Sequence, residues 1–97
     1  MTEQNKVTDS NFESLAKTRS AFLFVSDKSG HSKLMQERLA NVEGQKYIVD
    51  VADCLAVCAK YGIKSVPTLA VFEDNAPVVI RKGLLTEEDL QRIVAKN

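Results

Sequence analysis

The chain has 97 residues, of which 44% are hydrophobic and 27% are charged, and its thirteen basic residues balance its thirteen acidic ones. This length fits one domain, residues 1–97, and the composition is that of a folded protein rather than a disordered or collagen-like chain. Because no basic cluster is longer than Arg81-Lys82, we expect neither nucleic acid nor a charged membrane surface as a partner.

The amino terminus, Met-Thr-Glu-Gln-Asn-Lys, lacks the apolar segment of a secretory signal, and the longest apolar run, Ala21 to Val25, is too short to cross a membrane. We therefore expect a cytoplasmic location. The two cysteines, Cys54 and Cys58, are too few for the disulfide framework of a small secreted domain.

The first half of the chain predicts a helix, a strand and a second helix. Thr8-Asp9-Ser10 opens a short helix, in which Ser10 has capping-box spacing to Glu13. The apolar run at 21–26 is typical of a strand buried on both faces. Apolar residues then recur at helical spacing over 32–42, and Gly44 is expected to close that helix.

The middle of the chain predicts a second buried strand at 47–51. Asp53 is expected to cap a helix that runs to Tyr61 and ends at Gly62. A third strand follows at 68–73.

A turn at 74–77 and a hairpin strand at 78–82 complete the predicted sheet, with Pro77 suited to a sheet edge. Thr86 is expected to cap a last helix whose inward face carries Leu90, Ile93 and Val94. Lys6-Val7 would allow a short additional first strand. Alternating helices and strands favour parallel pairing, and the hairpin adds an antiparallel pair, so the sequence predicts a mixed sheet with helices on both faces.

Three segments carry a family resemblance: "AFLFVSDKSGHSKLM", "YIVDVADCLAVCAKYGIKSVPTLAVFEDN", and Gly83 before the last helix. In order and spacing they resemble the thioredoxin family over nearly the whole chain. The resemblance implies the thioredoxin-like α/β fold, a three-layer α/β/α arrangement with a mixed central sheet. It also implies thiol–disulfide exchange by a Cys-x-x-Cys pair at the start of the second helix.

In this chain the positions that match the two cysteines hold Ser29 and Ser32. Without the resemblance, both serines would be read as ordinary helix caps. A serine hydroxyl does not ionise near neutral pH and forms no disulfide, so dithiol exchange is excluded at this site as the chain stands. Gly30-His31 matches the Gly-His pair of the disulfide-isomerase-like branch, in which the histidine favours the thiolate.

With cysteines restored, the motif would read Cys-Gly-His-Cys. The resemblance therefore implies a thiol–disulfide oxidoreductase scaffold in a redox-dead Ser-Gly-His-Ser form, with His31 and the two serines at the catalytic positions. Two origins stay open: replacement of both cysteines in an active protein, or natural loss of redox function. The alternative function is a naturally redox-inactive module that binds proteins, as a chaperone-like or assembly factor.

The segment "KSVPTL" resembles the family loop that carries a cis-proline beside the active site, so we expect Val66–Pro67 to be a cis peptide bond. An extended protein or peptide substrate would pair with the Val66 backbone there, as an added strand. Lys28 stands where thioredoxins usually have tryptophan, and with Gly30 it would border this groove. A reductase would be a further partner if the cysteines were restored.

Leu23 and Ile48 stand where thioredoxins often have a buried carboxylate and a lysine. The loss of both charged residues together is physically consistent, because either charge alone would be costly to bury. It makes a fast thioredoxin-type reductase less favoured than a slower oxidoreductase.

No cofactor or metal is expected, because His31 has as possible co-ligands only Cys54 and Cys58 on a different helix. Both cysteines fit small buried residues, and their i, i+4 spacing suits a disulfide poorly. We also consider that the field of the helix N-terminus lowers the pKa of Cys54 and makes it reactive, or that the redox role has moved to this pair.

Overall fold

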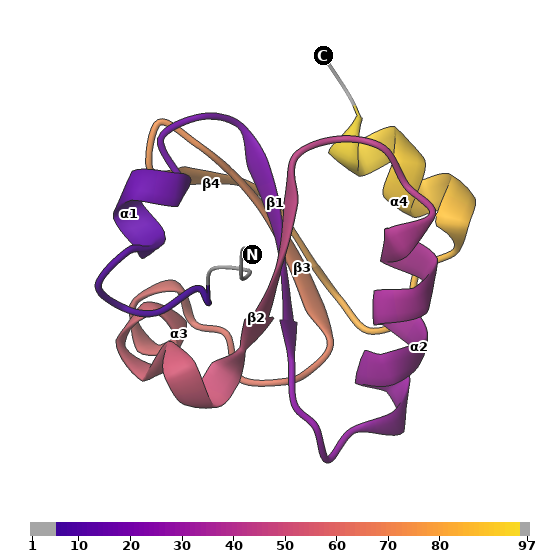
Figure 1. Cartoon of the computed structure of the whole chain (residues 1–97), viewed down its shortest axis with the longest axis horizontal. Coiled ribbons are helices and arrows are strands. Elements are labelled where there is room, and N and C mark those ends of the chain that lie inside the picture. The colour runs from indigo at the N-terminus through magenta and orange to yellow at the C-terminus, as the bar shows by residue number, and fades with distance from the viewer. Residues whose placement is uncertain (1–5, 96–97) are drawn as a thin grey trace, which may run out of the picture.

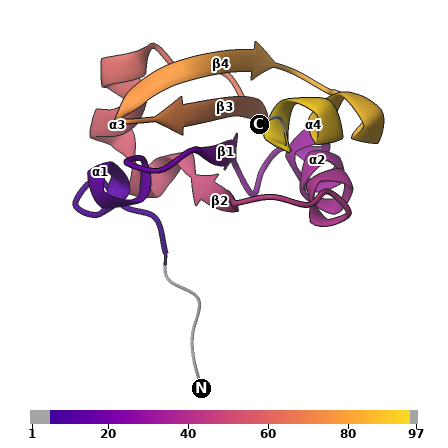
Figure 2. The ribbon, with the colours of Figure 1, turned by 90° about the horizontal axis from the view of Figure 1, so that it is seen from above.

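The structure is a computed structural model that describes residues 6–95, and its helices and strands form three layers (Figures 1 and 2). In chain order the elements are α1 (Phe12–Leu15), β1 (Ser20–Val25), α2 (Gly30–Ala40), β2 (Lys46–Asp50), the 3-10 helix η1 (Val51–Asp53), α3 (Leu55–Tyr61), β3 (Thr68–Glu73), β4 (Ala76–Lys82) and α4 (Glu87–Val94).

The four strands form one mixed sheet in the order β2-β1-β3-β4. β1 pairs with β2 in parallel, whereas the β1–β3 and β3–β4 pairs are antiparallel. Helices α1 and α3 cover one face of the sheet, and α2 and α4 cover the other (Figure 2). This arrangement confirms the predicted thioredoxin-like three-layer α/β/α fold. Among residues 6–95, every helix is too short or too polar to span a membrane.

Strand β1 forms the centre of the core, and all six of its residues are buried. Its side chains alternate between the two faces of the sheet, as a strand requires. Phe22 and Phe24 pack with α1 and α3, where the ring centroids of Phe22 and Phe12 lie 4.7 Å apart. Leu23 and Val25 pack with α2 and α4. The continuous apolar run therefore reflects burial on both faces, as predicted.

Several local signals are confirmed. The side chain of Thr86 caps α4 by accepting a hydrogen bond from the Asp89 N–H at 3.1 Å. Gly62 ends α3 in the left-handed conformation, with φ of 69°. The β3–β4 turn has positive φ at Asp74 and Asn75, which suits the tight hairpin turns that match strand twist. Pro77 lies on β4, at the edge of the sheet.

The predicted capping box at Ser10 is wrong. Asn11 occupies the N-cap position of α1, and no side chain caps this helix. The Asn11 Oδ1 instead accepts a hydrogen bond from the Thr8 N–H at 2.7 Å, and its Nδ2 donates to the Lys6 carbonyl at 2.9 Å. The Ser10 hydroxyl lies 3.0 Å from that of Thr8. A turn closed by Asn11 therefore opens the helix in place of the capping box.

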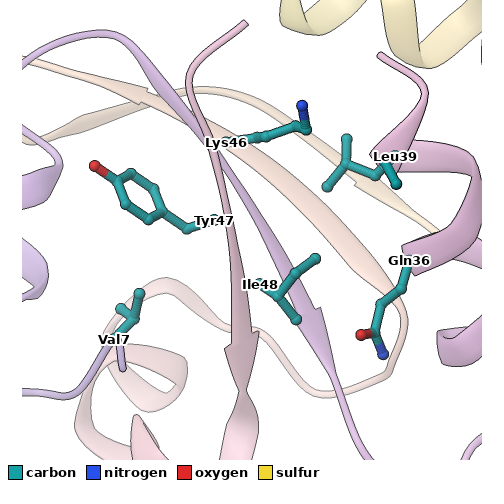
Figure 3. A pocket seen from close by; sticks show the side chains of 7 residues that line it. Val7, Gln36, Leu39, Lys46, Tyr47 and Ile48 are labelled. Atoms are coloured by element: carbon teal, nitrogen blue, oxygen red, sulfur yellow. The ribbon is translucent and has the colours of Figure 1, made fainter. Parts of the chain in front are cut away.

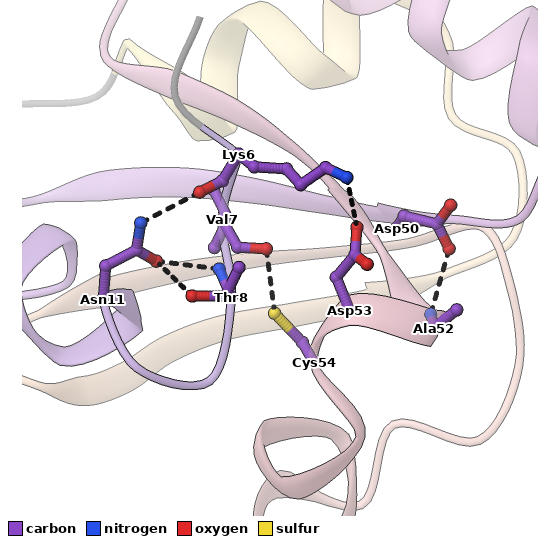
Figure 4. A network of polar contacts seen from close by, with 8 residues as sticks. All are labelled: Lys6, Val7, Thr8, Asn11, Asp50, Ala52, Asp53 and Cys54. Carbon is purple, nitrogen blue, oxygen red and sulfur yellow. Dashed lines mark hydrogen bonds and ion pairs between the residues drawn. The ribbon is translucent and has the colours of Figure 1, made fainter.

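The predicted cap of α3 by Asp53 is also wrong. Asp53 lies in η1, where its carboxylate is 3.7 Å from the Lys6 ammonium (Figure 4). The carboxylate of Asp9 accepts hydrogen bonds from the N–H groups of Ala56 at 3.2 Å and Val57 at 3.0 Å. The N-terminus of α3 is thus capped from a loop that lies far away in the sequence.

The predicted second strand differs in position and in burial. β2 begins at Lys46 and is an edge strand, with only Val49 fully buried and Ile48 42% exposed. An edge strand has a neighbouring strand on one side only, so its side chains are less completely covered than those of a central strand. An apolar run in the sequence does not distinguish an edge strand from a central one.

The second helix ends earlier than predicted, at Ala40, and Gly44 lies four residues beyond that end. No strand forms at Lys6–Val7 either. The Val7 carbonyl accepts a hydrogen bond from the Cys54 thiol at 3.4 Å instead (Figure 4).

Candidate functional site

Two loops leave the same end of the sheet and lie next to each other. Phe24 near the end of β1 is the register partner of Thr68, the first residue of β3. The loop after β1, which carries Ser29, therefore starts beside the end of the loop that carries Pro67 (Figure 1). This juxtaposition brings the two halves of the predicted site together.

Ser29 is the N-cap residue of α2. Its backbone is extended, with φ −111° and ψ 118°, and its hydroxyl oxygen accepts a hydrogen bond from the Ser32 N–H at 3.1 Å. This is the usual N-cap geometry, and such a cap contributes about 1 kcal/mol. The local role of a helix cap is therefore confirmed for Ser29.

Ser32 lies one turn further along and is fully buried. Its hydroxyl oxygen accepts a hydrogen bond from the Ser26 N–H at 3.3 Å. The Ser26 hydroxyl in turn accepts one from the Lys28 N–H at 3.2 Å. The exposed side of this turn thus carries Ser29 and its buried side carries Ser32, and hydrogen bonds connect both residues to the same turn.

The electrostatics of this turn favour negative charge at Ser29. The first turn of α2 contains no acidic residue, and its unpaired N–H groups carry the positive end of the helix dipole. The exposed cations Lys28 and Lys33 line one surface hollow together with Ser29, and the exposed carboxylate of Asp27 lines the same hollow and offsets part of their charge. In this field the Ser29 hydroxyl caps the helix.

His31 occupies the second residue of α2 and is exposed. Within residues 6–95, no three His, Cys, Asp or Glu side chains are grouped as metal ligands. His31 thus follows Ser29 by two residues and is open to solvent.

The Val66–Pro67 peptide bond is cis, as predicted. Pro67 is buried and its carbonyl accepts a hydrogen bond from the Gly83 N–H at 2.8 Å, while Val66 stays half-buried. Beside Val66 lies a cavity of 390 Å³ with a largely apolar lining. It is lined by Ser26, Val51, Leu55, Cys58, Ile63, Lys64, Ser65 and Val66. Leu55 is 67% exposed there, so an apolar side chain of a partner could cover it.

Sequence reasoning did not single out Ser26 and Leu55. Ser26 lines both the hollow beside Ser29 and the cavity beside Val66, so it connects the two halves of the site. Its hydroxyl bonds to the N–H two residues ahead, a spacing that serine often uses in turns and that "SDK" could have suggested. For Leu55, nothing in the surrounding sequence indicates that a leucine at the start of a helix would be exposed beside the site.

Leu23 and Ile48 are register partners on neighbouring strands. Leu23 is fully buried on the face of the sheet that α2 covers, whereas Ile48 is partly exposed. The two positions are thus neighbours in space, as the resemblance implies, and they carry no charge.

The burial of Cys54 argues against the hypothesis that it is reactive. Both cysteines are free and buried, and the Cys54 side chain has no exposed surface. Burial, assisted by the negative charge of Asp9, raises the pKa of the Cys54 thiol to about 12. The same two causes raise the pKa of Cys58. The helix N-terminus does not compensate, because the Asp9 carboxylate already occupies it.

We therefore expect Cys54 in native protein to react with a thiol reagent at pH 7.5 on the order of 100-fold or more slowly than in unfolded protein. The pKa of the Cys54 thiol in the folded protein lies above its ordinary value of 9.0. The buried neutral thiol therefore makes its full contribution to the free energy of unfolding below pH 9. This contribution is lost as the pH rises toward about 12, because the unfolded chain then ionises first. Labelling of a Cys58→Ala variant followed by peptide mapping isolates Cys54. Equal labelling rates in native and unfolded protein would contradict the expectation.

Comparison with known proteins gives one consistent result. The family model described as Thioredoxin matches residues 3–96. A thioredoxin of Staphylococcus aureus is 32% identical over 99 aligned positions, which cover 95% of this chain and 95% of that protein. Among solved structures, a mutant thioredoxin from Halobacterium salinarum superimposes with a TM-score of 0.74 at 22% identity, covering 89% of this chain and 78% of its own. Thioredoxin from Malassezia sympodialis gives a TM-score of 0.77 at 16% identity, covering 92% and 84%. The chain belongs to the thioredoxin family.

Proposed function

We propose that this chain is a thiol–disulfide oxidoreductase scaffold in which Ser29 and Ser32 occupy the positions of the reactive cysteines. As it stands, it binds protein or peptide substrates without exchanging disulfides with them. The observation that carries the proposal is the position of Ser29 and Ser32 at the start of α2, beside the Pro67 loop, in a chain that the thioredoxin family model matches over residues 3–96.

The exchange reaction explains why the two positions need sulfur. A thiolate at position 29 attacks one sulfur of a substrate disulfide, forms a mixed disulfide and releases one substrate thiolate, which takes up a proton. A thiolate at position 32 then attacks the sulfur at position 29 and releases the second substrate thiol. The protein pair is oxidised by two electrons and the substrate disulfide is reduced by two. Ser29 and Ser32 can perform neither step.

Other residues of the site would serve binding and tuning. The Val66 backbone would pair with an extended substrate, and Pro67 would border the groove. Lys28 and Gly30 would contact the substrate from the other side. In the variant with cysteines, the imidazole of His31 would favour the thiolate at position 29. The partner is therefore a protein or peptide, and a reductase would join only when position 29 and position 32 carry sulfur.

The test is a Ser29→Cys/Ser32→Cys double variant. It is expected to form a disulfide that dithiothreitol reduces, and to catalyse dithiothreitol-dependent reduction of a protein disulfide, whereas the parent chain shows none. The matched control is Ser29→Ala/Ser32→Ala, which keeps the motif length and has no sulfur. A folded double-cysteine variant, verified by circular dichroism, that shows no activity above this control would refute the proposal.

A second candidate function is a redox-inactive module that holds a protein partner in the same groove. Fully buried Leu23 and the neighbouring Ile48 favour it, because together they leave no carboxylate–lysine pair to serve proton transfer. Lys28 in place of an aromatic residue also favours it. Partner capture that is lost in Val66→Asp and Lys28→Glu variants, and unchanged in the double-cysteine variant, would support this candidate. Capture that is stronger in the double-cysteine variant than in the parent chain would support the oxidoreductase scaffold, because only sulfur at position 29 can hold a substrate as a mixed disulfide.

A further inference from the structure

The loop between β4 and α4, residues 83–85, lies beside Pro67. The Gly83 N–H donates a hydrogen bond to the Pro67 carbonyl at 2.8 Å, and Lys82 at the end of β4 is the register partner of Thr68. The loop itself is neither helix nor strand, so no regular backbone pairing fixes it. Its position against Pro67 therefore depends on the few contacts that its own residues make.

Helix α2 supplies two of these contacts, both at Leu85. The Arg38 guanidinium donates a hydrogen bond from Nη1 to the Leu85 carbonyl at 2.7 Å, across a sequence separation of 47 residues. The Leu85 N–H donates to the thioether sulfur of Met35 at 3.4 Å, and thioether sulfur is a weak acceptor. Because a charged donor makes the stronger hydrogen bond, Arg38 is the main attachment of this loop to α2.

The side chain of Arg38 is committed to this contact. It is half-buried, and within residues 6–95 it forms no ion pair. Met35 and Arg38 lie on the side of α2 that faces the loop. Gln36 and Leu39, each one position later, instead face β2 across a hollow of 330 Å³ (Figure 3). The guanidinium is therefore directed to the loop rather than to the edge of the sheet or to a carboxylate.

These contacts join the helix that carries positions 29 and 32 to the segment that would bind substrate. Arg38 holds Leu85, and Gly83, two residues earlier in the same loop, bonds to Pro67. Pro67 follows Val66, whose backbone would pair with an extended substrate. Energetic coupling passes between parts of a protein through such contiguous contacts. A change at Arg38 is therefore expected to reach the substrate segment without altering either serine.

We propose that Arg38 is a positioning residue of the substrate site, which holds the loop 83–85 against Pro67 and so sets how strongly the site binds a protein or peptide. This inference rests on the proposed function, because it takes the segment at Pro67 as the place where substrate binds. Arg38 lies in the last turn of α2, whereas Ser29 and Ser32 lie at its start. Its effect is therefore on binding and not on the exchange chemistry.

The first measurement is amide hydrogen exchange in the parent chain and two variants. Arg38→Met removes the donor but keeps a long unbranched side chain. Asn41→Ala is the matched control, because the Asn41 side chain joins α2 to Glu87 of α4 by a hydrogen bond of 2.9 Å that does not involve the loop. The Gly83 amide is expected to exchange about tenfold faster in Arg38→Met and at the parent rate in Asn41→Ala. Amides at the centre of β1 serve as the reference, because they report global unfolding.

The second measurement adds the same substitutions to the Ser29→Cys/Ser32→Cys variant. Arg38→Met is expected to raise KM for a protein disulfide about fivefold and to leave kcat unchanged. The rate with hydroxyethyl disulfide should not change, because this small substrate has no peptide backbone to pair with Val66. Arg38→Lys keeps a charged donor and should raise KM less than Arg38→Met does. A general loss of folded protein would instead lower the rates with both substrates.

The outcomes separate this inference from the proposed function. A folded double-cysteine variant without activity refutes the proposed function, and the role of Arg38 in substrate binding is refuted with it. In an active double-cysteine variant, unchanged exchange at Gly83 overturns the inference alone, because Arg38 then does not hold the loop. Faster exchange at Gly83 with an unchanged KM also overturns it, because the loop then does not set binding. An equal rise of KM in Arg38→Met and Asn41→Ala overturns it as well, because weaker packing of α2 would explain both.

Discussion

Replacing Leu23 by aspartate is expected to lower the free energy of unfolding by about 3–5 kcal/mol at pH 7. Leu23 is fully buried at the centre of β1, in a cluster with Met35, Leu39 and Leu69. A carboxylate at this position would be removed from water without an opposite charge, because its neighbours are apolar. Urea unfolding of the parent and the variant measures the difference.

The pH dependence identifies the cause of this loss. Burial would raise the folded-state pKa of the new carboxyl above its ordinary value of about 3.9, so the unfolded chain would ionise first as the pH rises. The deficit is therefore expected to be smallest near pH 4 and to grow toward pH 7. Leu23→Asn is the matched control, since it loses the same packing but cannot ionise. Equal deficits for both variants at both pH values would show that charge burial is not responsible.

A second substitution tests whether a lysine at position 48 can compensate for a buried carboxylate at position 23. Ile48 is the register partner of Leu23 on β2 and is partly exposed, so a lysine there would reach solvent and the buried carboxylate together. The double variant Leu23→Asp/Ile48→Lys should be more stable than Leu23→Asp alone. The same lysine placed at exposed Val78 on β4 should give no such recovery.

The parts of the fold that short stretches determine were predictable from the sequence. Three such signals act within a few residues, and the structure confirms all of them. They are the apolar run of β1, the N-cap residue Thr86 of α4, and Gly62 at the C-terminal end of α3. The cis bond before Pro67 came from the family resemblance rather than from local chemistry, and it is also confirmed.

The parts that distant contacts determine were not predictable from the sequence. Asp9 caps α3 across a separation of 47 residues to Ala56, and nothing in the sequence around either residue indicates that contact. Burial of the Cys54 thiol depends on the same packing, so its pKa could not be read from its position near a helix start. Apolar strands predict burial but do not say which strand lies at an edge, and β2 shows this.

For the candidate site, the sequence located the residues but not their relations. The spacing of Ser29 and Ser32 placed them on one helical turn, and the structure adds that Ser29 is half-buried while Ser32 is fully buried. It also adds Ser26, whose N–H bonds to the Ser32 hydroxyl and whose side chain closes the turn. These relations depend on how the end of β1 meets α2, which no local pattern encodes.

Gly44→Ala is expected to lower the free energy of unfolding by about 2–4 kcal/mol. Gly44 has φ of +129°, a conformation that residues with a side chain rarely adopt. A Cβ atom there would also lie 2.8 Å from Cγ1 of Val94 and 3.4 Å from its carbonyl oxygen. The turn before β2 would then have to move away from the end of α4.

Two other glycines with open space around them serve as comparisons. Gly62→Ala meets no atom within 4 Å but has φ of +69°, so it should lose only the conformational cost, about 1–2 kcal/mol. Gly30→Ala also has open space and lies in the first turn of α2, so it should be neutral or stabilise the protein by up to about 1 kcal/mol. Urea unfolding of the three variants should rank their losses as Gly44, Gly62 and Gly30. A Gly44→Ala loss no larger than that of Gly62→Ala would contradict this ranking, which depends on two differences: the contact of the added Cβ with Val94, and the φ of +129° at Gly44 against +69° at Gly62.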